Sequence, residues 1–339
     1  MTPKRYNLAD IARELQVSVS LVSLVLNNRH REQRISSQTA ERILTYCREI
    51  GYQPNIHTKR MRSRIVRNVM FYANVSVDNT EFDHVLFRVL NGVIAEADQH
   101  KVSVTVYSGR LEHAEKRLLG SLRSSEVDGV ICYGNEFPNY LQDIIINERR
   151  QVVAVSSSGG RGIHTVNLND REITREMVQK LLIPKGRKRY LYLGGTAVSF
   201  PGQERYAGFR EALKENGIPF SDDQYFECRF RGHIASEKIE ELLASGTPLP
   251  DAIVCANDRM AIGVIKTLQK HHIDVPGTVS VCGGDGIDAG LFMTPQLTSF
   301  KYTGFELGKA AFRLLWNKVN GGNAENEVIA AELQPGESV

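Results

Sequence analysis

The sequence predicts a protein of two unlike parts: an all-α head that contains a helix-turn-helix, and an α/β body of two parallel-sheet lobes. Three observations support this prediction. Apolar residues recur at helical spacing in two short segments of Asn7–Asn28, positive charge gathers in residues 1–67, and strands alternate with helices from Asn68 onward. The 339 residues are enough for a small domain and a larger two-lobed one.

The segment Asn7–Asn28 has the pattern of two short helices joined by a tight turn. Asn7 and Ser18 can each cap a helix, because their side chains accept from free amides of a first turn. The inward-facing sets are Leu8, Ile11, Ala12 and Leu15, then Val19, Val22, Val25 and Leu26. Between the buried positions, the second helix presents small or short-chain residues, which would let it lie deep in a DNA major groove: Ser18, Ser20, Leu21, Ser23 and Leu24. A short helical hairpin in a small bundle stays open as the alternative.

The charge is divided unevenly along the chain. Residues 1–67 hold 13 Lys and Arg against 5 Asp and Glu, whereas the remainder holds 29 against 34. A basic head on a mildly acidic body is typical of a nucleic-acid-binding module joined to another domain, although a solvated basic face without a partner remains open. Neither a signal peptide nor a membrane span is expected, and five widely spaced cysteines predict reduced thiols in a cytoplasmic protein.

A third helix is predicted over Thr39–Ile50, with Gly51 at its end. Asn55 can then cap a short basic helix, which would be marginal in isolation and would order on phosphate. Met61 is its large apolar side chain, suited to wedge into a minor groove, although a plain charged linker remains open. The expected divisions are a head of residues 1–53, a hinge of 54–67 and a body of 68–339.

The body alternates between strands and helices in two successive sets. The first set has strands at Val69–Ala73, Val102–Tyr107, Gly129–Tyr133 and Val152–Ser156, and helices at Phe82–Gln99, Leu111–Ser124 and Tyr140–Asn147. The second has strands at Arg189–Leu193, Gln224–Cys228, Ala252–Cys255 and Val279–Cys282, and helices at Glu172–Leu182, Gln203–Asn216, Ile234–Ala244 and Met260–His271. A chain crossing is expected near Ile163–Leu168, and a ligand cleft at the carboxyl ends of the strands.

Polar residues just past the strand ends are the candidates for that cleft. Arg205 is placed near the start of a helix, where a cation is unfavourable to the helix dipole, so a ligand-binding task is indicated. Asn257 and Asp258 follow one strand, and since one cap suffices, the other is available to a ligand. Asp285 follows the next strand. Each residue has an alternative role as a cap, turn residue or solvated charge.

Motifs of catalysis are lacking in the sequence. There is no phosphate-binding G-x-x-x-x-G-K-[ST], no H-E-x-x-H and no G-x-S-x-G, and Gly284-x-Gly286-x-x-x-Gly290 has the wrong spacing for a dinucleotide loop. We therefore expect no enzyme activity, no catalytic residue, no metal and no cofactor.

Motifs along the whole chain resemble those of the LacI/GalR family of bacterial transcription regulators. They are Leu8-Ala9-Asp10-Ile11-Ala12, Val17-Ser18-Val19-Ser20, Val22-Ser23, Val25-Leu26-Asn27, Gly51-Tyr52-x-Pro54-Asn55, Val127-Asp128-Gly129-Val130-Ile131, Arg205-Tyr206-x-Gly208-Phe209, Ala256-Asn257-Asp258-x-Met260-Ala261-Ile262-Gly263, Val279-Ser280-Val281-x-Gly283 and Leu297-Thr298-Ser299. The resemblance implies a homodimer on a pseudo-palindromic double-stranded operator. It also implies a body like a type I periplasmic binding protein, with lobes of residues 68–164 plus 299–325 and 165–298 plus 326–339, controlled by a sugar or related metabolite between them.

The expected site residues follow from the motifs and the resemblance together. The expected DNA contacts are Leu8, Ser18, Val19, Ser20, Leu21, Ser23, Leu24, Asn27, Arg31, Arg34, Ser36, Thr39, Asn55, Lys59 and Met61. The expected effector contacts are Phe82, Arg88, Asn169, Glu172, Arg205, Asn257 and Asp285. The effector would shift the population between two lobe arrangements and thereby change operator binding.

The sequence departs from the family pattern at three places. Leu24 stands where the family usually has Arg, which predicts an altered half-site, and the loop Arg29–Arg34 is longer and carries three arginines. Gly284 and Gly286 replace an aromatic residue and a second acid, so we expect the pocket to lose a ring wall. Two alternatives remain: the same fold with a vestigial cleft and a protein partner, or an enzyme with an appended DNA reader.

Overall fold

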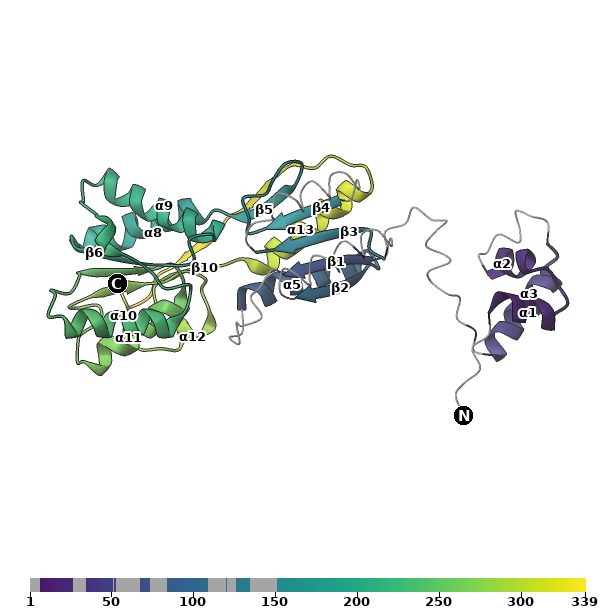
Figure 1. The fold of residues 1–339 in the computed structure, drawn as a ribbon, viewed down its shortest axis with the longest axis horizontal. Helices are drawn as coiled ribbons and strands as arrows, with labels where there is room; N and C mark the ends of the chain where they lie inside the picture. Colours follow the sequence, from purple (N-terminus) through teal and green to yellow (C-terminus); the bar gives the residue numbers. More distant parts are fainter. Residues whose placement is uncertain are drawn as a thin grey trace. The chain divides into compact units, whose positions relative to one another are not determined.

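The computed structural model describes residues 7–26, 35–50, 52, 68–73, 84–108, 120, 126–134 and 151–339. The chain divides into two compact units, residues 1–65 and residues 66–339 (Figure 1). The helices of the head lie in the smaller unit, and the strands and helices of the body lie in the larger one.

The head contains α1 (Leu8–Glu14), α2 (Val19–Leu26) and α3 (Ser37–Glu49). The predicted cap at Asn7 is confirmed, since its side chain accepts from the amides of Ala9 and Asp10. Ser18 likewise accepts from the amide of Leu21 at 3.1 Å. Between the helices, Gln16 has φ of +53° and the amide of Val17 donates to the carbonyl of Ala12, which ends α1 and turns the chain.

One apolar cluster holds the three helices of the head together. It consists of Ile11, Ala12, Val22, Val25, Ala40, Ile43 and Cys47, all of them buried. The third helix begins at Ser37, two residues before the predicted start, because the hydroxyl of Ser36 caps it by accepting from the amide of Thr39. These contacts confirm the predicted helix-turn-helix with a third supporting helix.

The first sheet of the body has the strand order β11-β5-β4-β3-β1-β2, and all its pairs are parallel. Its strands are β1 (Asn68–Ala73), β2 (Ser103–Ser108), β3 (Gly129–Tyr133), β4 (Gln151–Val155), β5 (His164–Leu168) and β11 (Glu327–Ile329). The helices α5 (His84–Gln99) and α13 (Gly304–Val319) pack against each other beside it (Figure 1). The helices expected at residues 111–124 and 140–147 fall largely outside the described residues.

The second sheet has the order β7-β6-β8-β9 and is also parallel. Its strands are β6 (Tyr190–Gly194), β7 (Tyr225–Glu227), β8 (Ala252–Cys255) and β9 (Ser280–Cys282). The helices around it are α8 (Asp170–Met177), α9 (Phe200–Glu215), α10 (Gly232–Ala244), α11 (Asp258–Lys270) and the short α12 (Asp288–Leu291). A separate antiparallel pair joins β10 (Ser299–Lys301) to β12 (Glu332–Gln334). The predicted α/β body of two parallel sheets is thus confirmed.

Three chain passages connect the two lobes, and hydrogen bonds join them to one another. The first passage is residue 169, the second is residues 302–303 and the third is residues 330–331. Asn169 on the first passage accepts with its side-chain oxygen from the amide of Ala331 on the third, at 2.8 Å. The amide of Asn169 donates to the carbonyl of Ile329, and Thr303 on the second passage donates to the carbonyl of Ala330. The lobes are therefore joined by a hydrogen-bonded bundle of three passages.

Two strands lie a few residues beyond the lobe boundaries expected from the sequence. The segment Ile163–Leu168, expected to be the crossing, contains β5, and the chain crosses immediately after it. Residues 327–329 likewise form β11, which pairs with β5 in the first sheet rather than with the second lobe. Both strands extend the first sheet at one end, where β5 lies between β4 and the edge strand β11, and this pairing depends on distant residues rather than on local pattern.

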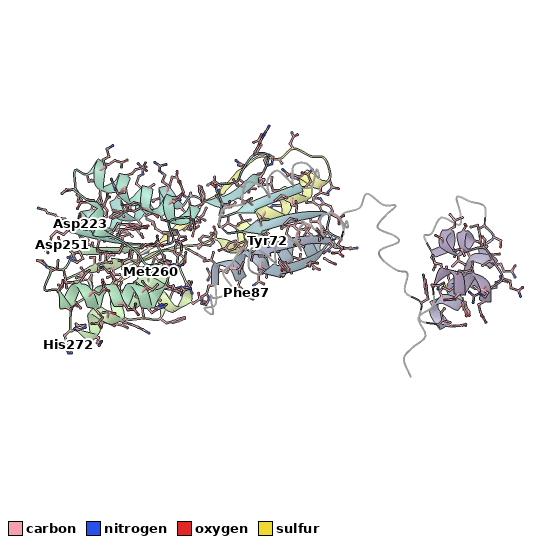
Figure 2. The ribbon with its side chains drawn as sticks, in the orientation of Figure 1. Tyr72, Phe87, Asp223, Asp251, Met260 and His272 are labelled. Atoms are coloured by element: carbon pink, nitrogen blue, oxygen red, sulfur yellow. The ribbon has the colours of Figure 1, made fainter. Side chains whose placement is uncertain are left out.

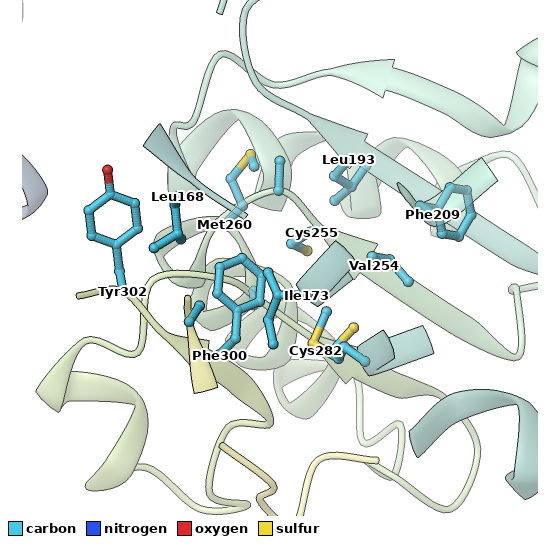
Figure 3. Close-up of a cluster of buried hydrophobic side chains, with 14 of the residues drawn as sticks. Leu168, Ile173, Leu193, Phe209, Val254, Cys255, Met260, Cys282, Phe300 and Tyr302 are labelled. Atoms are coloured by element: carbon cyan, nitrogen blue, oxygen red, sulfur yellow. The ribbon is translucent and has the colours of Figure 1, made fainter. Parts of the chain in front are cut away.

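Apolar side chains fill the body between sheets and helices. In the second lobe the cluster includes Leu193, Phe209, Val254 and Cys282, with Phe300 beside them and Tyr302 at its border (Figure 3). Figure 2 shows Met260 and Tyr72, which are buried, and Asp223 and His272, which are exposed. All five cysteines are buried free thiols, as the sequence predicts. None of the helices in the described ranges is long and apolar enough to cross a membrane.

Tyr192 on β6 is fully buried, and its hydroxyl has no hydrogen-bond partner among the described residues. Its ring packs against Tyr206 and Phe209 of α9. Burial raises the pKa of Tyr192, so the hydroxyl stays neutral. Replacing Tyr192 by phenylalanine would remove this unpaired hydroxyl and keep the ring contacts.

We expect Tyr192→Phe to raise the free energy of unfolding by up to about 1 kcal/mol, because an unpaired buried hydroxyl is a net penalty. Urea unfolding measures the change. Tyr225→Phe, a half-buried neighbour in the same ring cluster, is the control, and its free energy should change by less than about 0.5 kcal/mol. A loss of more than about 1 kcal/mol in Tyr192→Phe would contradict the assignment of an unpaired hydroxyl.

Candidate functional site

The second helix of the head presents a small, partly apolar face to solvent. Ser18, Val19 and Ser20 are exposed, with Val19 at 45%. The prediction that Val19 faces inward was therefore wrong, since at the first position of α2 it lies outside the head's apolar cluster. Leu24 is half-buried and lies outside the apolar cluster of the head, whereas Leu21 packs partly against that cluster. The start of α2 therefore combines hydroxyl and methyl groups, which can contact phosphates, base edges and thymine methyls.

The other predicted DNA contacts divide into described and undescribed residues. Leu8 packs partly against the core of the head, Ser23 is half-buried, and the hydroxyls of Ser36 and Thr39 lie 2.8 Å apart at the start of α3. Six predicted contacts lie outside the described residues: Asn27, Arg31, Arg34, Asn55, Lys59 and Met61. These assignments stay predictions.

Arg205 forms the centre of a buried ion cluster in the body. Its Nε donates to Oδ1 of Asp170 at 2.7 Å, and its Nη1 donates to Oδ1 of Asp285 at 2.9 Å and to the carbonyl of Ala256 at 2.5 Å. Arg205 and Asp170 are only 3% and 2% exposed. The structure therefore brings together two predicted effector residues, Arg205 and Asp285, and adds a third charged group, Asp170.

The position of Arg205 in its helix differs from the prediction. α9 begins at Phe200, capped by Ser199, so Arg205 lies beyond the first turn, and the argument from the helix dipole was wrong. Pro201 is in the first turn, where a missing amide hydrogen is harmless. The ion pairs, rather than the helix end, account for the cation.

Burial and charge act in opposite directions within the cluster. Burial disfavours the charged guanidinium, but the charges of Asp170 and Asp285 outweigh it and raise the pKa of Arg205. Burial raises the pKa of Asp170, while the charge and hydrogen bond of Arg205 oppose this shift. The cluster thus holds one cation against two carboxylates in a site with little water.

Aromatic rings border the guanidinium on the β10 side. The Cζ of Arg205 lies 4.9 Å from the ring centroid of Phe300 and 5.9 Å from that of Tyr302. A Cβ at Gly284 would lie 2.7 Å from the Phe300 ring, so this ring fills the space beside the glycine. The expectation that the pocket loses a ring wall at Gly284 was therefore wrong, because Phe300 of β10 places a ring there (Figure 3). The hydroxyl of Tyr302 also lies 2.9 Å from that of Ser156 at the end of β4, which links the cluster to the first sheet.

Asn257 and Asp258 divide their roles at the start of α11. Asn257 caps the helix by accepting from the amide of Met260 at 3.0 Å, and its Nδ2 donates to the carbonyl of Phe230 at 3.2 Å. Asp258 is 1% exposed and accepts from the hydroxyl of Ser299 and the amide of Ile287. Burial raises the pKa of Asp258 to about 6, although both hydrogen bonds lower it.

The remaining predicted effector residues have other surroundings. Asn169 lies in the bundle of chain passages, Glu172 is exposed on α8, and Arg88 on α5 pairs with Asp288 at 3.6 Å. Phe82 lies outside the described residues. Whether any of them contacts an effector stays a prediction.

Sequence reasoning did not assign Asp170, Ser299, Phe300 or Tyr302 to the cluster. Asp170 directly follows the predicted Asn169, and a buried arginine needs acidic partners, so an acid at a strand end was an available signal. The other three come from the second chain passage and its strand, whose proximity no local pattern reveals.

Two family models match the chain. The model of bacterial regulatory proteins of the lacI family matches residues 7–55, and a periplasmic binding protein-like domain matches residues 180–339. The chain belongs to the LacI family of bacterial regulatory proteins. In this LacI-family protein the first matched segment contains the helix-turn-helix, and the second contains Arg205 and Asp285 of the buried cluster, whereas Asp170 lies before it.

Relatives support the same family over almost the whole chain. Catabolite control protein A of Priestia megaterium is 26% identical over 324 residues, 94% of each chain. The transcriptional repressor PurR of Pasteurella multocida is 25% identical over 332 residues, covering 97% of this chain and 96% of that one. The protein is accordingly a LacI-family transcription regulator with a DNA-binding and an effector-binding domain.

Solved structures show the same fold. The lac repressor dimer bound to operator and the anti-inducer ONPF has a TM-score of 0.83 at 22% identity and covers 99% of both chains. The transcriptional regulator CelR in complex with cellobiose has a TM-score of 0.73 at 23% identity, covering 99% of this chain and 100% of that one.

We expect Arg205→Met to lower the free energy of unfolding by about 3–5 kcal/mol, because it leaves two buried carboxylates without a cation. Adding Asp170→Asn and Asp285→Asn should restore at least half of the loss. Denaturant unfolding of the three proteins measures both effects. Arg189→Met is the matched control, since its pair with Asp251 lies at the surface, where water screens the charges, and its loss should change the free energy of unfolding much less. Equal losses for Arg205→Met and Arg189→Met would contradict the buried cluster.

Proposed function

We propose that the protein is a repressor that binds a pseudo-palindromic double-stranded operator as a homodimer and responds to a small molecule at the Arg205 cluster. The observation that carries the DNA half is the exposed start of α2, where Ser18, Val19 and Ser20 take no part in the core of the head. In the same proposal, residues 1–53 form the DNA-binding head, 54–67 the hinge and 68–339 the effector-binding and dimerisation body. Action on chromosomal DNA implies a cytoplasmic location.

The proposed operator contacts are those expected from the sequence, with Leu24 as the most informative. Because Leu24 lies outside the head's apolar cluster, it is available to contact a thymine methyl where an arginine would read guanine. The operator should then differ from the one that an arginine at this position selects.

The charges around Arg205 favour an uncharged effector. Asp170 and Asp285 already pair with the guanidinium. Asp258 is a further buried acid, and it follows β8 as Asp285 follows the parallel neighbour β9, so both lie at the same edge of the second sheet. An anionic ligand would enter a site whose carboxylates outnumber its cation, whereas hydroxyl groups could hydrogen-bond to those carboxylates. Relatives consistent with this include the regulator CelR, whose structure holds cellobiose.

The effector would act by favouring one arrangement of the two lobes. The three hydrogen-bonded passages and the Tyr302–Ser156 contact join the cluster to both sheets, so a ligand there can bias how the lobes meet. The bias equals the difference in affinity for the two arrangements.

A protein partner is the second candidate for the controlling signal. The observation in its favour is that Arg205 and Asn257, both expected to bind an effector, already donate to groups of their own chain. In this case the cluster would be structural, and small molecules would leave its stability unchanged.

Selection of DNA from a random library with the full-length protein should enrich a pseudo-palindrome. Leu24→Arg should change the preferred base pair at one position of each half-site towards G·C, because a guanidinium binds the O6 and N7 of guanine. Thr45→Arg, which adds the same charge on α3, is the control and should leave the preference unchanged. A library without an enriched palindrome, or an identical preference after Leu24→Arg, would contradict the proposal.

Thermal unfolding with matched compounds tests the effector class. We expect at least one of D-ribose and D-galactose to raise the melting temperature, and neither D-ribose 5-phosphate nor D-galacturonate to do so. Asp285→Asn should abolish the rise, because it removes the negative charge beside Arg205 and replaces one acceptor oxygen by an NH2 donor. A rise with the acids alone would exclude an uncharged effector, and no rise with any compound would favour the protein partner.

A further inference from the structure

The turn that carries Asp285 has an unusual backbone. It covers Gly283–Ile287, between β9 and α12, and Asp285 within it has φ of +132°. A non-glycine residue rarely adopts this conformation, and it persists only where surrounding contacts hold it. Two main-chain bonds flank it: the amide of Asp285 donates to the carbonyl of Phe300, and the amide of Tyr302 donates to the carbonyl of Asp285.

Two buried side chains, those of Asp258 and Ser299, form hydrogen bonds with the turn. Oδ2 of Asp258 accepts from the amide of Ile287 at 2.8 Å, and its Oδ1 accepts from the hydroxyl of Ser299 at 2.5 Å. The same hydroxyl accepts from the amide of Gly286 at 3.2 Å, and the amide of Asp258 donates to the carbonyl of Gly284. The pair therefore bonds to the turn on both sides of Asp285.

The carboxylate of Asp258 is not needed to cap its own helix. Asn257 is the cap of α11 and accepts from the amide of Met260. Asp258 points instead into the turn, and a Cβ at Gly283 would lie 2.4 Å from its Oδ1. Ser299 is fully buried and comes from β10, a different element. Because a buried carboxylate is costly unless it is hydrogen-bonded, these bonds to the turn and to Ser299 account for the burial of Asp258.

We propose that Asp258 and Ser299 are positioning residues that hold Asp285 in its strained conformation, aimed at Arg205. This deepens the proposed function and rests on it only in that the Arg205 cluster binds the effector. Neither side chain contacts Arg205 through a hydrogen bond among those described; both act through the turn. The hydrogen bonds of Asp258 and Ser299 to the turn thus compensate for the strain at Asp285.

A double-mutant cycle on the full-length protein tests the positioning role. Ser299→Ala should lower the melting temperature by about 3 °C or more in the wild-type background. In the Asp285→Gly background the same change should have less than half that effect. Glycine adopts a positive φ without strain, so the turn no longer depends on the bonds from Asp258 and Ser299. Ser338→Ala is the control: Ser338 is equally buried and bonds to Val281 and Thr298, so its effect should be equal in both backgrounds.

Hydrogen exchange gives a second readout, at the amides of Gly286 and Ile287. Both amides should exchange at least tenfold faster in Ser299→Ala and in Asp258→Asn, and at the wild-type rate in Ser338→Ala. Asp258→Asn replaces Ser299→Ala in the cycle if the latter does not fold.

Equal effects of Ser299→Ala in the two backgrounds, or unchanged exchange at both amides, would overturn the proposal. Neither measurement uses DNA or a sugar. The positioning role of Asp258 and Ser299 can therefore be refuted while operator and effector binding are confirmed, and it can be confirmed while they are refuted.

Discussion

A guanidinium that is removed from water needs opposite charge close by, and this requirement shapes the centre of the second lobe. Arg205 comes from α9, Asp170 begins α8 directly after the first chain passage, and Asp285 follows β9. The carbonyl of Ala256 after β8 completes the set. Four segments far apart in sequence must therefore meet at one point, and any of them displaced would leave a buried charge unpaired.

The head depends on a different constraint, since helices of seven and eight residues are marginal in isolation. Capping by Asn7 and Ser18 and a small apolar cluster supply the missing stability. Arg42 adds a tie from α3 to the carbonyl of Leu15 at the end of α1. Val19 and Ser20 are exposed and lie outside this cluster, so the methyls of Val19 and the hydroxyl of Ser20 face solvent.

Much of this architecture is readable from the sequence, because period and caps are local properties. The helix-turn-helix, the third helix and the alternation of the body follow from spacing alone. The candidacy of Asp285 follows from its place after a strand, whereas Arg205 was selected for a position at a helix start that it does not occupy. Contacts between residues far apart in the sequence do not follow from local spacing. The sequence cannot show that β11 lies beside β5, that Phe300 fills the space at Gly284, or that Asp258 rather than Asn257 faces the turn. The start of α9 was misplaced because Pro201 and Gly202 suggest a loop, although a first turn tolerates both.

The three passages between lobes have a consequence for biosynthesis. The edge strand β11 of the first sheet and the helix α13 that packs beside it are encoded after the second sheet and the helices α8–α12, so a ribosome must synthesise those elements before the first sheet can be completed. The head, by contrast, emerges before the body and has its own core. Vectorial synthesis thus leaves the first lobe with an unpaired edge while the second lobe forms, and that nascent edge is where early misassembly would start.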